Sequence, residues 1–162
     1  MCSSDLVVDE PTAGLDPEER HRFHNILSDI SENRIVILST HIVDDVATLC
    51  PRLAVIKSGR VVADTTPAAA RGSVEGLVHE GFVDDADLAG FAAAHRVLSA
   101  VLVEGRTNRV RVFVPPGQAA PAGFGKSPGT LEDAYLVLMR VADHEVPPAL
   151  ARSIPAETEA RR

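Results

Sequence analysis

Residues 6–17 read LVVDEPTAGLDP, and this stretch decides how the chain is interpreted. An apolar run at 6–8 ends in two adjacent carboxylates, Asp9 and Glu10. A turn-rich segment follows, and Pro17 then fits the first position of a helix. The apolar run predicts a strand buried on both faces, as in parallel sheets, and α/β proteins bind phosphate ligands at the carboxyl ends of such strands. The stretch therefore predicts a phosphate-handling site in an α/β fold.

The carboxylate pair has the chemistry of a magnesium-dependent nucleotide hydrolase. At the carboxyl end of a strand, one carboxylate can hold Mg²⁺ directly or through its waters and balance the charge of a phosphate. The next side chain points differently and can orient or deprotonate the attacking water. An Asp-Glu dipeptide alone is most often an ordinary feature of a strand end. The segment EPTAGLDP that begins with the second carboxylate makes the functional interpretation the better one.

Strand and helix signals alternate as far as residue 72. Asp16 suits the N-cap of a helix that has an acidic first turn and ends near residue 32. Its apolar stripe falls at helical spacing on Phe23, Ile26, Leu27 and Ile30. The later elements are a buried strand at 35–38, a helix from 43 that Pro51 stops, a hairpin of strands 53–56 and 61–63 around Ser58-Gly59, and a short helix from Pro67 to about Gly72.

The composition shifts after residue 73, and the signals become those of a small α+β unit. We expect a strand at 74–83, an Ala-rich helix at 84–95, a hairpin of strands 97–103 and 110–114, a Pro/Gly/Ala-rich loop at 115–129, and a helix that the capping box Thr130–Asp133 opens. Arg106, Arg109 and Arg111 are expected to form one solvated strand face. Prolines and charges after residue 143 predict a loose tail.

Composition excludes several classes of function. The 162 residues are 45% apolar and 24% charged, as in an ordinary globular protein. The net charge of −7 and the lack of a basic stripe argue against a nucleic-acid partner. No apolar run reaches membrane-spanning length, and the N-terminus is too short and polar for a signal peptide. The cysteines and the histidines outside the motifs fit no metal or disulfide pattern: Cys2, Cys50, His21, His24, His79, His95 and His144.

The motifs within residues 6–71 resemble those of the ATP-binding subunits of ABC transporters. LVVDEP is similar to the Walker B motif, AGLDP to the D-loop, and STH after the next strand to the switch-histidine loop. The resemblance implies two catalytic residues, Glu10 polarising the hydrolytic water and His41 contacting the γ-phosphate. It also implies that Asp9 serves Mg²⁺, directly or through water, and that Asp16 reports across a head-to-tail ATPase dimer.

The resemblance implies a fold class and a division of the chain. Residues 6–72 would be the C-terminal part of a P-loop NTPase of the α/β class, and residues 74–142 a small accessory α+β domain. Residues 1–5 are expected to be a non-native leader, because Asp5 is out of place before a buried strand, and residues 143–162 a flexible tail. The segment TLEDAYLVLM is similar to the end of subunits that serve ABC-2-type export permeases.

Cofactors, partners and location follow from the same resemblance. It implies ATP and Mg²⁺ as cofactors, a second ATPase subunit and a membrane permease as partners, and export as the process. The protein would be cytoplasmic and peripheral, held at the inner face of the cell membrane through the permease.

Three motifs that precede Walker B in that family do not occur in this sequence: the Walker A loop, the glutamine-containing loop and the LSGGQ-type signature. APAGFGKS at 120–127 fits a relaxed phosphate-loop pattern, but Pro121 precedes its glycines and Pro128-Gly129 blocks a following helix. We therefore expect a fragment that is inactive alone, with strand edges and an apolar patch exposed.

Two other classes of function stay open at this point. In the first, the chain is a non-enzymatic interaction module in which residues 74–142 bind a partner and the ATPase remnant is inert. In the second, the chain belongs to an ABC-type DNA-repair or chromosome ATPase. The acidic balance and the hairpin that follows STH argue against the second class.

Overall fold

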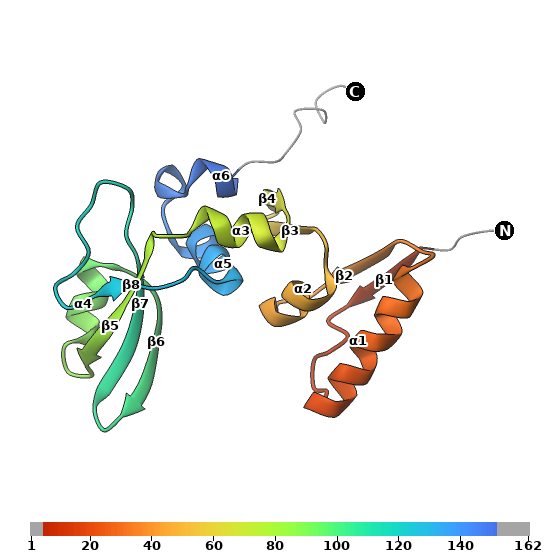
Figure 1. Cartoon of the computed structure of the whole chain (residues 1–162), viewed down its shortest axis with the longest axis horizontal. Helices are drawn as coiled ribbons and strands as arrows, with labels where there is room; N and C mark the ends of the chain where they lie inside the picture. Colours follow the sequence, from red (N-terminus) through yellow and green to blue (C-terminus); the bar gives the residue numbers. More distant parts are fainter. Residues whose placement is uncertain (1–4, 152–162) are drawn as a thin grey trace. The chain divides into compact units, whose positions relative to one another are not determined.

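The computed structural model describes residues 5–151, and the structure divides after Pro51 into two compact units (Figure 1). The first unit contains β1 (Leu6–Asp9), α1 (Pro17–Ser31), β2 (Val36–Ser39) and α2 (Val43–Leu49). The second contains β3 (Leu53–Lys57), β4 (Arg60–Thr65), α3 (Pro67–Ser73), β5 (Val78–Asp84), α4 (Leu88–Ala94), β6 (Arg96–Glu104), β7 (Thr107–Phe113), β8 (Gly125–Lys126), α5 (Leu131–Arg140), a 3₁₀ turn (Asp143–Glu145) and α6 (Pro148–Ala151). The mixed α/β class is confirmed.

Strands β1 and β2 pair in parallel, and this pairing organises the first unit. Leu6 lies opposite Val36 and Asp9 opposite Ser39, so both strands end at the same edge. Helix α1 begins with the predicted capping box: the Glu19 amide donates to Asp16 Oδ1 at 2.8 Å, and the Asp16 amide donates to Glu19 Oε2 at 3.5 Å. The capping box therefore determines where the chain leaves the turn after β1.

One face of this small sheet is bare. The exposed fractions of Val7, Ile35 and Ile37 are 70%, 64% and 56%. Residues along β1 and β2 alternate between partly buried and exposed, whereas the sequence predicted strands buried on both faces. Parallel sheets are normally covered on both faces, so an exposed apolar surface of this kind is unusual. The expected exposure of an apolar patch in this chain is thus confirmed, and burial of both faces stays a prediction for the intact domain.

The second unit is built around an antiparallel sheet of strand order β6-β7-β5-β8. Val110, Val112 and Val114 form a buried cluster. Helix α4 packs against it through Leu88 and Phe91, and the loop before β8 packs against it through Phe124. The Phe91 and Phe124 rings stack with centroids 5.1 Å apart. Gly81 is required beneath this stack, because a Cβ there would lie 2.6 Å from the Phe124 ring.

The hairpin of β3 and β4 and helix α3 lie in the second unit. Ser58 (φ 52°) and Gly59 (φ 76°) make the expected two-residue turn, in which both residues take left-handed backbone angles. Helix α3 contacts α5 and α6, and β4 also contacts α6. The packing boundary therefore falls after Pro51, whereas the sequence boundary was expected at 72–74; the division into residues 6–72 and 74–142 stays a prediction.

Several boundaries differ from the expected ones, among them the start of β5 and the C-terminal tail. Strand β5 begins at Val78, because residues 74–77 form a turn in which Val74 is fully buried. The expected loose tail is instead packed as far as residue 151: Leu150 of α6 is fully buried, and Arg96 donates to Glu145. Residues 1–4 and 152–162 lie outside the described residues, so the expected non-native leader and the end of the tail stay predictions. No helix among the described residues is long and apolar enough to cross a bilayer.

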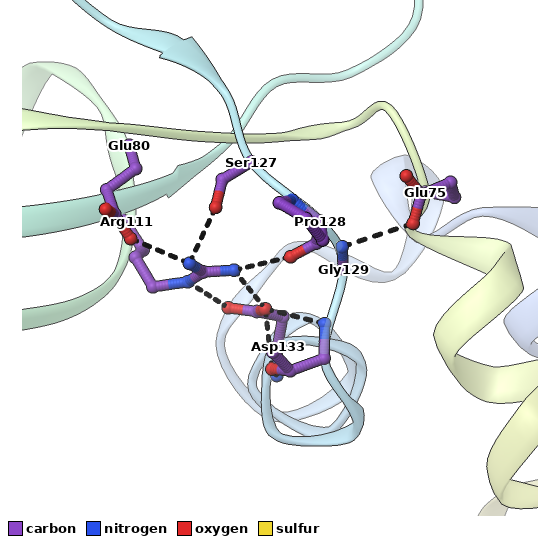
Figure 2. A network of polar contacts seen from close by, with 8 residues as sticks. Glu75, Glu80, Arg111, Ser127, Pro128, Gly129 and Asp133 are labelled. Atoms are coloured by element: carbon purple, nitrogen blue, oxygen red, sulfur yellow. Dashed lines mark hydrogen bonds and ion pairs between the residues drawn. The ribbon is translucent and has the colours of Figure 1, made fainter.

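Arg111 is the centre of a polar network in the second unit (Figure 2). Its guanidinium donates to both carboxylate oxygens of Asp133 at 3.0 and 2.7 Å and to Glu80 at 2.8 Å. It also donates to the Ser127 hydroxyl at 2.9 Å and to the Pro128 carbonyl at 2.8 Å. One side chain thus joins β7 to β5, to the loop after β8 and to the start of α5.

The expectation of a solvated strand face is confirmed for Arg109 and wrong for Arg111, whereas Arg106 is exposed but lies in the turn between β6 and β7. The antiparallel register places Arg111 opposite Glu80, and the capping box of α5 brings Asp133 to the same guanidinium. Burial raises the pKa of the Asp133 carboxyl, but the hydrogen bonds from Arg111 and Thr130 outweigh it and hold the pKa below its usual value. The ionised carboxylate therefore stabilises the fold.

We expect Asp133→Asn to lower the stability of the second unit by about 2 kcal/mol at pH 7. Because folding lowers the pKa of Asp133, its stabilisation is complete above the unfolded pKa of about 3.9 and disappears as the pH falls through the folded pKa. The difference between wild type and variant should therefore shrink below about pH 4. Urea unfolding measures this difference in stability. The fluorescence of Tyr135, the single tyrosine in a chain without tryptophan, follows the unfolding.

Glu132→Gln is the matched control, because Glu132 is the exposed neighbour of Asp133 and loses the same charge. It should change stability by less than about 0.5 kcal/mol at either pH. An Asp133→Asn variant as stable as wild type at pH 7 would contradict a stabilising role for this carboxylate.

Candidate active site

The carboxyl ends of β1 and β2 bring the predicted motif residues together. The Glu10 amide continues the parallel ladder by donating to the Ser39 carbonyl at 2.8 Å. The Ser39 hydroxyl donates to Asp9 Oδ1. The carboxylate of Asp9 is therefore oriented by a hydroxyl from the neighbouring strand, as the shared strand edge requires.

Glu10 and His41 are in direct contact across this edge. His41 Nδ1 lies 2.8 Å from Glu10 Oε1, and the His41 amide donates to the same oxygen at 3.0 Å. The Thr40 hydroxyl lies 3.4 Å from Glu10 Oε2. The side chains are 37% exposed for Glu10 and 73% exposed for His41. The two predicted catalytic residues thus form an accessible pair, although 31 positions separate them in the sequence.

The backbone at Glu10 is strained. Its φ is 44°, in the left-handed region that non-glycine residues rarely occupy. The turn that follows is closed by the Ala13 amide, which donates to the Glu10 carbonyl at 3.2 Å, and it contains Gly14 at φ 83°. Strain of this kind persists where the surrounding structure enforces it, and it is frequent at functional sites.

Asp16 stands apart from this pair in the described chain. Its carboxylate accepts the Glu19 amide and caps α1, and no hydrogen bond or ion pair joins it to Asp9, Glu10 or His41 among residues 5–151. Its position at the exposed start of a helix leaves the carboxylate accessible.

The donor set at the strand edge suits Mg²⁺ better than a metal held by protein ligands alone. No group of three His, Cys, Asp or Glu side chains among the described residues could hold a metal ion. Mg²⁺ is typically bound through one or two carboxylates, with waters and substrate phosphates completing its shell. The Asp9 carboxylate and the Ser39 hydroxyl are oxygen donors of the required kind.

The segment APAGFGKS has no phosphate-loop geometry. Gly125 and Lys126 form β8, which pairs antiparallel with β5, and the next helix begins only at Leu131. Ser127 accepts a hydrogen bond from Arg111. The backbone amides that would hold phosphate at the start of a helix are therefore not arranged to do so, as the sequence predicted.

Sequence reasoning missed a buried polar cluster next to the pair. The Thr12 hydroxyl donates to Asp45 Oδ2, and His24 Nε2 lies 3.0 Å from Asp45 Oδ1. Thr12 is fully buried and Asp45 is 1% exposed. The only sequence signal was that Asp45 follows His41 by four positions.

Cys50 lies at the end of α2 near this cluster. Burial raises the pKa of the Cys50 thiol, and the negative charge of Asp45 raises it further. The thiol therefore stays protonated at neutral pH and behaves as a small apolar group.

No family model matches the chain, but curated ABC transporter ATP-binding proteins are similar to part of it. The energy-coupling factor transporter ATP-binding protein EcfA2 of Ligilactobacillus salivarius is 48% identical over 64 residues, 38% of this chain and 22% of that protein. Nod factor export ATP-binding protein I of Paraburkholderia xenovorans and of Rhizobium leguminosarum bv. viciae are each 40% identical over 65 residues, 40% of this chain and 21% of theirs.

The matches span only about a fifth of the length of these curated relatives. Within about two fifths of this chain, they confirm the resemblance to ABC transporter ATP-binding proteins that the motifs indicated.

We expect Glu10→Gly to leave the first unit more stable than Glu10→Ala by about 1 kcal/mol. Both variants lose the carboxylate, and only glycine adopts the left-handed backbone of residue 10 without strain. Thermal unfolding followed by circular dichroism would compare the two. Ala13→Gly is the control, since Ala13 has no positive φ, and it should give no gain. Equal stabilities for the glycine and alanine variants would show that the strain at Glu10 is not present in solution.

Proposed function

We propose that residues 6–72 are the C-terminal part of an ABC-type ATPase domain, and that the intact protein couples ATP binding and hydrolysis to transport through a membrane permease. The observation that carries the proposal is the 2.8 Å contact of Glu10 with His41 at the strand end that also carries Asp9. The similarity to transporter ATP-binding proteins supports it, over the part of the chain that matches.

Each side chain of the site has a role in this proposal. Asp9, oriented by Ser39, holds Mg²⁺ directly or through water, and the ion neutralises phosphate charge when bound. Glu10 accepts or polarises the proton of the attacking water. His41 contacts the γ-phosphate and holds the Glu10 carboxylate through its ring and its amide. Asp16, exposed at the start of α1, faces the second ATPase subunit of a head-to-tail dimer.

The chain supplies only part of such an enzyme, so the proposal assigns the missing functions to residues outside it. The β- and γ-phosphates need a lysine and backbone amides, and neither Walker A nor the signature motif occurs in the sequence. The second ATPase subunit, the permease and a peripheral position at the inner face of the membrane belong to the intact protein. Export is the proposed process, on the likeness of TLEDAYLVLM to export subunits and on the names of the Nod factor relatives.

The second unit keeps the interaction-module alternative open. Residues 74–142 would be an accessory α+β domain in the main proposal. The tip of the β6–β7 hairpin exposes Val101, Leu102 and Val103 by 51%, 60% and 46%, and Phe82 of β5 is 66% exposed. Exposed apolar side chains of this kind favour partner binding by this unit.

We expect this chain alone to bind Mg-ATP no more tightly than about 1 mM, or about −4 kcal/mol. The strand-end carboxylates attract the metal ion, but the sequence has no Walker A loop, whose lysine and backbone amides would hold the β- and γ-phosphates. Isothermal calorimetry measures the affinity, and Lys126→Ala should leave it unchanged. Micromolar binding that Lys126→Ala abolishes would show that APAGFGKS is a phosphate loop after all.

Glu10→Gln tests the catalytic role in a chimera whose N-terminal part, taken from one of the similar ATP-binding proteins, precedes residue 6. The amide keeps the shape of the side chain and cannot take a proton, so ATP binding should persist and hydrolysis should fall by about 10²- to 10⁴-fold or more. Steady-state phosphate release is the assay. Glu18→Gln, an exposed charge change in α1, is the control and should leave the rate unchanged. Near-normal hydrolysis by Glu10→Gln would remove Glu10 from the catalytic role.

A further inference from the structure

The carboxylate of Asp45 joins three segments of the first unit inside the protein. It lies in the first turn of α2 and is 1% exposed. Thr12, in the turn after β1, donates its hydroxyl to Oδ2, and His24 of α1 lies with Nε2 at 3.0 Å from Oδ1. Both carboxylate oxygens are therefore used by other segments of the chain.

Side-chain capping of α2 does not explain this arrangement. The N-cap of α2 is Ile42, which makes no side-chain capping bond, and neither hydrogen bond of the Asp45 carboxylate goes to its own helix. Burial of an ionised carboxylate is costly unless hydrogen bonds compensate for the lost hydration. The placement of Asp45 makes sense if its bonds hold the three segments in one geometry.

The two bonded segments are the ones that carry the proposed catalytic pair. Thr12 follows Glu10 by two positions in the tight turn, and Asp45, in the first turn of α2, follows His41 by four positions. The surface contact of Glu10 with His41 and the buried contact of Thr12 with Asp45 thus connect the same two segments. An exposed contact between side chains contributes little to holding such a geometry, whereas a buried hydrogen bond to a carboxylate contributes more.

We propose that Asp45 is a positioning residue, which couples the turn of residues 12–16 to the loop of residues 39–41 through the buried Thr12–Asp45–His24 cluster. The cluster determines where His41 lies relative to Glu10, although Asp45 touches neither of them. The role of this cluster in ATP hydrolysis rests on the proposed function. The coupling of the two segments is a property of this chain.

Hydrogen exchange by NMR on the 162-residue chain tests the coupling. The reporting amides are Leu15, which donates to the Thr12 carbonyl, and His41, which donates to Glu10. Thr12→Val removes the hydroxyl at nearly constant volume and should speed exchange at both amides by about tenfold. The amide of Val8 in the strand ladder should change by less than about twofold.

Conservative variants separate positioning from general destabilisation. Thr12→Ser keeps the hydroxyl and should restore slow exchange at both amides. Asp45→Ala should act as Thr12→Val does. The double variant Thr12→Val/Asp45→Ala should exchange no faster than Asp45→Ala alone, because each substitution removes the same Thr12–Asp45 hydrogen bond. Asp44→Ala, an exposed neighbour on α2, is the control and should leave both amides as in wild type.

Several results would overturn the proposal. Uniform acceleration of exchange, including at Val8, would mean that Thr12 acts only on overall stability. Acceleration at Leu15 without a change at His41 would mean that the two segments are not coupled. Asp45→Ala is the more disruptive variant, so the proposal is decided on Thr12→Val and Thr12→Ser if Asp45→Ala does not fold.

The same variants in the chimera separate this proposal from the proposed function. Thr12→Val should lower kcat by about tenfold and change KM for ATP by less than about twofold, since positioning affects the chemical step. Loss of turnover in Glu10→Gln with normal kcat in Thr12→Val would refute the positioning role and leave the proposed function intact. Normal turnover in Glu10→Gln would refute the proposed function, and the exchange data on the chain would still decide the coupling.

Discussion

The parallel, in-register pairing of β1 with β2 is the constraint on which the candidate site depends. Because Asp9 lies opposite Ser39, the residues that follow each strand emerge at one edge. A shift of one residue would turn the side chains of one strand to its other face and separate Glu10 from His41. The apolar strands therefore do more than form a core: their register brings two distant polar segments together.

The site combines exposed polar groups with a buried support. Glu10 and His41 are accessible and meet on a strained backbone, while Thr12 and Asp45 lie inside the first unit. Groups that must reach a substrate cannot be buried, so their positions have to be determined by residues behind them. A buried carboxylate with both oxygens bonded is suited to that task, because leaving either bond unmade is costly.

In the second unit, too, hydrogen bonds of a charged side chain hold several segments together, and there their role is structural. Arg111 and Asp133 are largely buried, and the guanidinium satisfies partners on β5, on α5 and in the loop between β8 and α5. The loop at 120–127, whose sequence imitates a phosphate loop, is held by that network and by pairing of β8 with β5. A motif of small residues thus has a structural role wherever its backbone amides are already committed to a sheet.

The sequence by itself determined the elements whose causes are local. The capping boxes at Asp16 and Thr130, the Ser58-Gly59 turn and the strand that ends at Asp9 depend on residues a few positions apart, so their patterns are legible in the chain. The motif order also placed Glu10 and His41 in one site. Only the tertiary structure decided the burial of Asp45 and Arg111 and the packing of α6. Their partners lie far away in the sequence, and a charged residue looks the same in a local pattern whether it faces water or a buried partner.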